Sequence, residues 1–312
     1  METIYGVQGN KPMDGYTGVG LGNFDGLHIG HTSLINILIR ESKLNGFKSV
    51  VYTFTKHPEN ILRKKLFTPL LTKESKKIEL LNETALDCLY FDEFDEEYSR
   101  MSPEEFVKKI LVNKLKAKIA VAGFDYHFGY KGEGDVQLLK ELGKKYKFKV
   151  IVIPSIKIDD EVVSSTKIRQ YVAKGSMNRV FNLLGRHYSI TAEVVSGRRV
   201  GNTIGFPTAN INPEGYLVLP QNGVYITKTL LNGVLYKSIT NIGYNPTFEA
   251  EKRLTVETHI IDFERDIYGE KIEVFFLKKI RDERKFSSIN ELKDQIKSDM
   301  QKAREFFDIF EN

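Results

Sequence analysis

The chain has 312 residues, of which 41% are hydrophobic and 28% are charged, and its formal net charge is +5. This composition is ordinary for a globular protein, does not indicate disorder, and allows two domains. The single cysteine excludes an internal disulfide framework and a cysteine-based zinc site, which favours a reducing compartment.

Neither a membrane nor a nucleic acid is an expected partner. No apolar run approaches the roughly 20 residues that span a bilayer, and the N-terminus lacks the basic and apolar regions of a secretory signal. The lysines are mixed with acidic residues and form only short clusters, which is typical of solvated faces rather than of a nucleic-acid-binding stripe. We therefore expect a cytoplasmic protein.

The first half of the chain alternates between strand and helix patterns. An apolar run at Thr17–Leu21 leads through the stretch Gly20–His31 into a helical pattern that ends at Asn45-Gly46. Further strands are expected at 49–55, 87–94, 118–124 and 147–154. Further helices are expected at 71–83, 102–115 and 135–146. This alternation predicts a doubly wound, Rossmann-like parallel sheet, with its ligand at the carboxyl ends of the strands near a switch in strand order.

Around Gly185 the pattern changes to short strands. These strands are expected at 188–195, 223–231, 233–242, 256–263 and 271–280. Asn232-Gly233 between two of them is a strong hairpin signal. We expect an antiparallel barrel or sandwich closed by a helix from about Ser287 to Phe307, and hence two domains, 1–185 and 186–312.

The stretch Gly20–His31 contains a candidate polyphosphate site. His28 and His31 share one face of the first helical turn, and the helix start supplies free N–H groups. Gly26 and Gly30 allow a ligand to approach the backbone closely. The pattern G-x-F-D-G-x-H-x-G-H resembles the signature of the nucleotidylyltransferase superfamily, and class I aminoacyl-tRNA synthetases share its last four residues. A plain turn with two satisfied histidines is the alternative.

Two further loops follow predicted strands and should face the same crevice. In Gly123–Gly129, an acid and several aromatic rings suit a planar ligand, although core aromatics explain them equally well. In Ser164–Arg169, hydroxyl groups begin a helix whose first turns carry a cation, which favours phosphate oxygens. A capping motif alone explains the serines but not Arg169.

The second half carries a different set of candidates. Three glycines at spacings of four, Gly197, Gly201 and Gly205, form with two arginines a cationic loop that suits phosphates. If the segment after this loop is extended, Thr208 and Asn210 point to the same side, and their neutral oxygens suit Mg²⁺ when phosphates supply the charge. Glu257 lies among apolar neighbours in a predicted strand, where it has either a function or a solvent-facing position.

Together these motifs resemble the prokaryotic bifunctional riboflavin kinase/FMN adenylyltransferase (FAD synthetase) family along almost the entire chain. The matching segments are Gly22–His31, Gly123–Gly129, Ser164–Arg169, Gly205–Asn210, Asn241–Gly243, Pro246–Phe248, Val256–His259 and Arg281–Phe286. The resemblance implies ATP-dependent phosphorylation of riboflavin in the second half and adenylylation of FMN, giving FAD, in the first. It also implies Mg²⁺ as the cofactor.

The resemblance also implies roles for individual residues. Glu257 would be the general base of the kinase, Thr208 and Asn210 would hold Mg²⁺, and His28, His31 and Arg169 would stabilise charge during adenylyl transfer. The residues expected to bind ATP or phosphate are Gly22, Asn23, Phe24, Gly26, Gly30, Ser164, Ser165, Thr166, Gly197, Gly201 and Gly205. The residues expected to bind flavin are Asp25, Asp125, Phe128, Asn241 and Arg281. For Asp25 and Asp125 the sequence does not choose between positioning flavin and positioning a metal.

Three alternatives remain open from the sequence. A monofunctional FAD synthetase with a silent barrel would have similar motifs. A tRNA synthetase would need a KMSKS-type loop and an anticodon-binding module, and the sequence offers neither. An RNA-binding protein that uses the barrel as a platform would show binding with a steep salt dependence.

Overall fold

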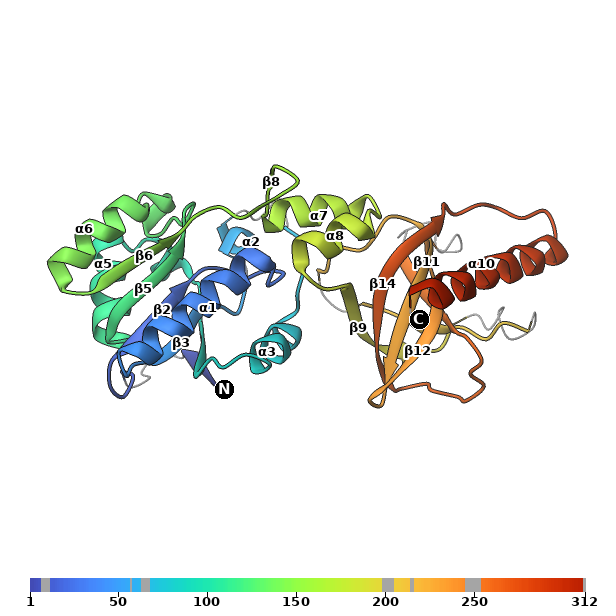
Figure 1. Ribbon diagram of the computed structural model, residues 1–312, viewed down its shortest axis with the longest axis horizontal. Helices are drawn as coiled ribbons and strands as arrows, with labels where there is room; N and C mark the ends of the chain where they lie inside the picture. The colour runs from blue at the N-terminus through green and yellow to red at the C-terminus, as the bar shows by residue number, and fades with distance from the viewer. Residues whose placement is uncertain are drawn as a thin grey trace. The chain divides into compact units, whose positions relative to one another are not determined.

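A computed structural model describes residues 1–6, 12–56, 58–62, 68–197, 205–213, 216–244 and 254–310. The chain divides into two compact units, Met1–Ser165 and Thr166–Asn312, and each is described here by itself (Figure 1). The helices between residues 165 and 184 thus fall mainly in the second unit, whereas the change in residue pattern suggests a domain boundary near Gly185. Among the helices that the structure describes, none combines the length and apolar character needed to cross a membrane.

The first unit is built on a six-stranded sheet in the order β1-β4-β3-β2-β5-β6, and every neighbouring pair is parallel. Its strands are β1 Glu2–Gly6, β2 Thr17–Leu21, β3 Lys48–Phe54, β4 Cys88–Asp92, β5 Ala117–Gly123 and β6 Lys149–Ile153. The predicted parallel sheet is confirmed, and the edge strand β1 is an addition. The strand order reverses between β2 and β5, so the loops that follow these two strands lie at the switch point.

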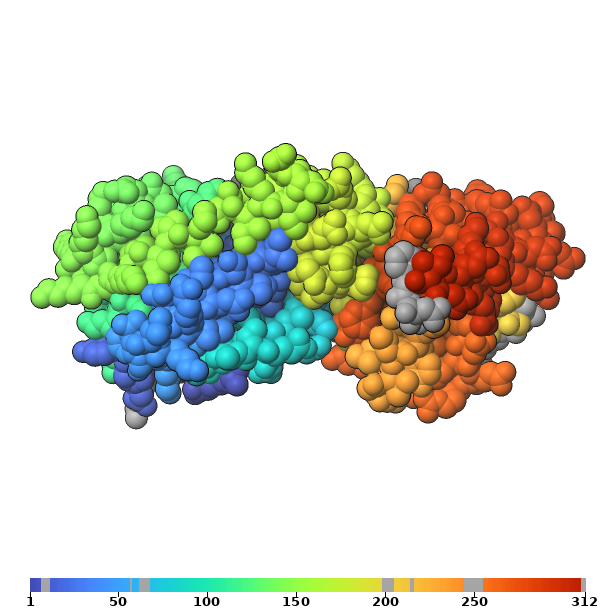
Figure 2. All heavy atoms as spheres, in the orientation of Figure 1, coloured from blue at the N-terminus to red at the C-terminus, as the bar shows by residue number. Residues whose placement is uncertain are grey.

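Helices cover both faces of this sheet. They are α1 Ile29–Leu44, α2 Pro58–Leu62, α3 Glu74–Asn82, α4 Glu96–Ser99, α5 Pro103–Phe106, the π-helix η1 Val107–Lys114, the 3₁₀-helix η2 Tyr130–Gly132 and α6 Val136–Tyr146. Apolar side chains of α1 and α3 pack on one face, and those of α5, η1 and α6 pack on the other. In Figure 2 the atoms of α1 and α3 lie side by side on the visible face of this unit. Ser102 caps α5, in a capping box with Glu105.

The remaining elements lead into a closed six-stranded barrel in the order β10-β13-β12-β11-β14-β9. They are β7 Lys157–Ile158, β8 Glu161–Val162, α7 Ser165–Ala173, α8 Met177–Leu184, β9 Tyr188–Val195, β10 Ala209–Ile211, β11 Gly223–Leu231, β12 Val234–Tyr244, β13 Leu254–Ile260, β14 Lys271–Arg281 and α10 Ile289–Phe310. The predicted antiparallel barrel with a terminal helix is confirmed. Asn232 and Gly233 have φ of 50° and 80°, which is the geometry of the expected tight hairpin between β11 and β12.

The barrel interior contains a chain of hydroxyl groups. The hydrogen bonds run from Thr229 through Ser238, Thr227 and Thr240 to Thr258, with oxygen–oxygen distances of 2.8 to 3.0 Å. All five side chains are fully buried, so these polar groups satisfy one another in place of water. Because Thr258 faces inward, the side chains of its neighbours in sequence point to the outside of the barrel.

Helix α10 packs across the outside of the barrel, where Ala303 and Phe307 contact Ile226 and Ile239. An ion pair anchors it, because the Nε of Arg281 donates to Asp299 over 2.9 Å at the end of β14. Asp299 is 1% exposed, and its other oxygen accepts from the amide of Gln295. Arg281, which was expected to bind flavin, therefore holds the terminal helix in this structure.

Replacing Arg281 by methionine should destabilise the barrel by about 3 kcal/mol, because the buried Asp299 carboxylate would lose its cation. Urea unfolding followed by circular dichroism measures this loss. The double variant Arg281→Met with Asp299→Leu removes the orphaned charge and should regain part of the stability. A double variant less stable than the single variant would contradict this account.

Candidate functional sites

The loop between β2 and α1 brings two imidazole rings together at a helix start. His28 is the N-cap of α1, and its Nδ1 accepts a hydrogen bond from the backbone N–H of His31 over 3.3 Å. The two rings stack with centroids 3.6 Å apart and planes inclined by 15°. An accepting Nδ1 carries no proton, so the Nε2–H of His28 is the group that can donate to a ligand.

This loop has a strained backbone. Phe24 and Leu27 have φ of 48° and 41°, values that non-glycine residues adopt at a cost of roughly 1–3 kcal/mol each. Phe24 is fully buried beneath the loop, and its ring centroid lies 5.2 Å from that of His31. Such a conformation persists only where the surrounding contacts hold it.

Asp25 supplies three of these contacts. Its carboxylate accepts from the backbone N–H groups of Leu71 and Thr72, over 3.0 and 3.1 Å, and is buried. Its carbonyl accepts from the hydroxyl of Ser165 over 2.8 Å, within the same unit. The carboxylate that was expected to contact flavin therefore binds the chain's own backbone here. Arg169 follows Ser165 by four residues, so the two share one face of α7.

The loop after β5 contains the remaining predicted aromatic. Phe128 is 5% exposed and packs against the rings of Phe106 and Tyr126 at centroid distances of 5.4 and 5.8 Å. These contacts favour the core explanation that the sequence left open for it. Phe124, which is 46% exposed, is the more open ring of this loop. Asp125 is exposed, and its carbonyl contacts the Nδ1 of His127.

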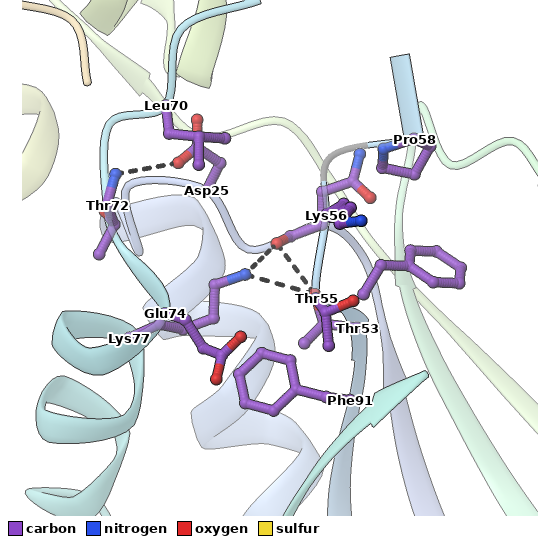
Figure 3. Close-up of a pocket in the computed structure, with 12 residues that line it drawn as sticks. Asp25, Thr53, Thr55, Lys56, Pro58, Leu70, Thr72, Glu74, Lys77 and Phe91 are labelled. Carbon is purple, nitrogen blue, oxygen red and sulfur yellow. Dashed lines mark hydrogen bonds between the residues drawn. The ribbon is translucent and has the colours of Figure 1, made fainter. Parts of the chain in front are cut away.

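A pocket opens beside the β2–α1 loop (Figure 3). Its lining comes from the loop itself, from the ends of β3 and β4, from the segment after β3 with the start of α2, and from α3 with the residues before it. The lining residues are Asn23, Asp25, Thr53, Phe54, Thr55, Lys56, Pro58, Leu70, Thr72, Glu74, Lys77 and Phe91. Sequence reasoning missed Lys77, which is buried and bonded to the loop. The signal was its position four residues before the buried Leu81, on the apolar face of its helix.

In the barrel, four predicted residues lie in one row across the outer face. Strand register pairs Asn210 with Glu257, Glu257 with Asn241, Asn241 with Val224, and Val224 with Arg281. Directly paired residues place their side chains on the same face. Glu257 is half-buried on this outer face.

The segment that leads into Asn210 is closely packed. A Cβ on Gly197 would lie 2.5 Å from the Cγ of Asn210, so the amide packs directly against the backbone where the glycine loop begins. Gly205 has a φ of 85°, and Gly201 lies outside the described residues, as does Pro246–Phe248. A second pocket next to Thr208 includes Pro207, Phe263, Glu264, Arg265 and Tyr268 in its lining.

His259 is a further residue that sequence reasoning did not single out. Its Nδ1 lies 2.7 Å from the carbonyl oxygen of Pro207, and its ring meets that of Phe206 edge-on. A carbonyl only accepts, so this nitrogen carries a proton. Burial lowers the pKa of His259, which favours the neutral ring. The contact fixes the segment that precedes Thr208.

Comparisons with known proteins cover both units. Family models match as FAD synthetase over residues 11–167 and as riboflavin kinase over residues 184–307. The chain is 37% identical to a bifunctional riboflavin kinase/FMN adenylyltransferase of Buchnera aphidicola subsp. Schizaphis graminum, with 99% of this chain and 100% of the relative covered. It is 34% identical to that of Escherichia coli strain K12, with 98% of each covered. It also resembles a crystal structure described as a macrolide-efflux protein from Streptococcus pneumoniae, with a TM-score of 0.89, 31% identity, and 97% and 99% coverage.

Proposed function

The chain belongs to the bifunctional riboflavin kinase/FMN adenylyltransferase family, and from this premise we propose how its residues perform the two reactions. The chain transfers the γ-phosphoryl group of ATP to riboflavin, and then the adenylyl group of a second ATP to the FMN formed. We assign adenylyl transfer to residues 1–185 and phosphorylation to residues 186–312. The matches to both families favour this bifunctional enzyme over a silent barrel, a tRNA synthetase or an RNA-binding protein.

Adenylyl transfer requires alignment and charge stabilisation rather than a base. The phosphate of FMN has a second pKa near ~6, like other phosphomonoesters, so at neutral pH it is largely a dianion. One of its oxygens attacks the α-phosphorus of ATP, and pyrophosphate leaves. The stacked His28 and His31 at the start of α1 carry this proposal, because they place N–H donors where anionic phosphates bind. The guanidinium of Arg169 would add positive charge that stabilises the phosphates during adenylyl transfer.

Phosphorylation of riboflavin does require a base. The 5′-hydroxyl is a neutral alcohol, and it must lose a proton as its oxygen attacks the γ-phosphorus and ADP leaves. We propose that the carboxylate of Glu257 takes this proton. Its support is the row in which Glu257 lies between Asn210 and Asn241, on the outer face of the barrel.

Mg²⁺ fits the same end of the barrel. Thr208 and Asn210 offer neutral oxygens, which suit Mg²⁺ when phosphates supply the negative charge. The register places Asn210 beside Glu257, and Thr208 lines the second pocket, to which we assign the adenosine of ATP. When bound, the ion would neutralise charge on the transferring phosphates. The single described cysteine is buried and free, which agrees with the cytoplasmic location that we propose.

Gly197→Ala should lower riboflavin kinase activity about tenfold or more, because the new Cβ displaces the Asn210 amide from its place beside Glu257. We also expect half-maximal kinase activity to need more Mg²⁺. Titrating Mg²⁺ in a kinase assay tests this, with adenylylation of added FMN as the internal control. An unchanged Mg²⁺ dependence would remove Asn210 from the metal site.

The reaction sequence itself can be followed directly. Purified protein is incubated with riboflavin, ATP and Mg²⁺, and FMN and FAD are separated over time. FMN should accumulate first, and FAD should follow with the release of pyrophosphate. FAD formed from added FMN, with no FMN formed from riboflavin, would instead identify a monofunctional FAD synthetase.

A further inference from the structure

We propose that Lys77 is a positioning residue for adenylyl transfer, whose ammonium group fixes the strained loop that presents His28, and that this loop loosens when the ammonium loses its proton. The inference rests on the proposed function of that loop. It adds a buried residue that acts through the backbone of the loop.

Lys77 and Thr53 hold the Asn23 carbonyl with two hydrogen bonds, and this pair of bonds is called the clamp below. Its Nζ donates to the carbonyl of Asn23 over 2.8 Å and lies 3.5 Å from the hydroxyl oxygen of Thr53, which donates to the same carbonyl over 3.0 Å. Dashed lines in Figure 3 mark hydrogen bonds of Lys77 in this pocket. The carbonyl belongs to the peptide that joins Asn23 to Phe24, the residue with φ of 48°. Rotating this peptide to relieve the strain would break both hydrogen bonds.

The charge of Lys77 strengthens the clamp. A hydrogen bond from an ionised donor is roughly twice as strong as one between neutral groups. The charged groups around the ammonium are the carboxylates of Asp25 and Glu74, the latter bound by Tyr5, and Lys56 in the pocket lining. The two carboxylates favour the charged form, but burial opposes it more strongly and lowers the pKa of Lys77 from 10.5 to about 8. The clamp therefore loses its charge within an accessible pH range.

Activity and stability should then change in opposite directions with pH. Lys77 in the unfolded chain keeps its proton until about 10.5, whereas in the folded unit it loses the proton above about 8. Between these values the unfolded state binds more protons, so the contribution of Lys77 to stability rises with pH. Adenylylation should fall over the same range. A residue that only supported the fold would not make adenylylation activity fall while stability rises.

The test compares the full-length wild type with Lys77→Met and with Lys144→Met, a matched change of an exposed lysine on α6. The measured quantity is kcat/KM for adenylylation of FMN between pH 7 and 9.5, because it reports ionisations of the free enzyme. For the wild type and Lys144→Met we expect a decline above pH 8. For Lys77→Met we expect a value about 10²-fold lower at pH 7.5 and nearly flat with pH. Riboflavin kinase activity in the same samples should be unchanged.

Two further measurements keep the result interpretable. Thr53→Val removes the second donor to the Asn23 carbonyl and should give a smaller loss of kcat/KM. Melting curves should show the wild type gaining stability relative to Lys77→Met as the pH rises above 8. A wild-type kcat/KM that stays flat to pH 9.5, or a Lys77→Met variant with wild-type values, would overturn the role of Lys77 alone. A wild type that forms no FAD would overturn the proposed function instead.

Discussion

Replacing Glu257 by glutamine is expected to lower riboflavin phosphorylation about 10²- to 10⁴-fold, the usual contribution of a positioned general base. Glutamine keeps the size of the side chain and its place between Asn210 and Asn241, but it cannot accept the hydroxyl proton. The loss should appear in kcat, because riboflavin and ATP keep their contacts with the rest of the site. Initial rates of FMN formation from riboflavin measure it.

Two controls isolate the effect of Glu257→Gln. Adenylylation of added FMN by the same variant should keep its wild-type rate, since that reaction uses a different unit and needs no base. Glu193→Gln makes the same change at an exposed position on β9 and should leave both activities intact. A loss of less than about tenfold in Glu257→Gln would remove this carboxylate from the role of base.

The features that the sequence predicts best are local ones. The turn at Asn232-Gly233 depends on two adjacent residues, and it forms as expected. Strand β1 was not predicted, and the segment of β10 was expected to be extended only conditionally, because three residues carry too little periodicity to separate a strand from a loop.

The arrangement of the sites was less accessible to sequence reasoning. The motifs give candidate residues, but the row of Asn210, Glu257 and Asn241 depends on strand register, which long-range pairing sets. Asp25 shows a second limit, because a motif does not reveal whether a carboxylate binds a ligand or backbone N–H groups. Lys77 shows a third, since a lysine in a helix is ordinarily solvated.

His28 and His31 give the largest effects expected in the first unit. His28→Ala or His31→Ala should lower FAD formation at least about 10²- to 10³-fold, because each removes a donor aimed at charge that develops on the phosphates. Riboflavin kinase activity of the same polypeptide should survive. Following FMN and FAD separately in one reaction measures both activities at once.

His28 also caps α1, so its two roles must be separated. His28→Asn retains an acceptor for the N–H of His31, since asparagine is a good N-cap, but it lacks the Nε2–H donor. We expect it to lose FAD formation as severely as His28→Ala, whereas only the alanine variant should lose about 1 kcal/mol of stability. Near-normal FAD formation by His28→Asn would mean that helix capping, rather than charge stabilisation, explains the motif. A folded variant in which both activities fell together would contradict two independent sites.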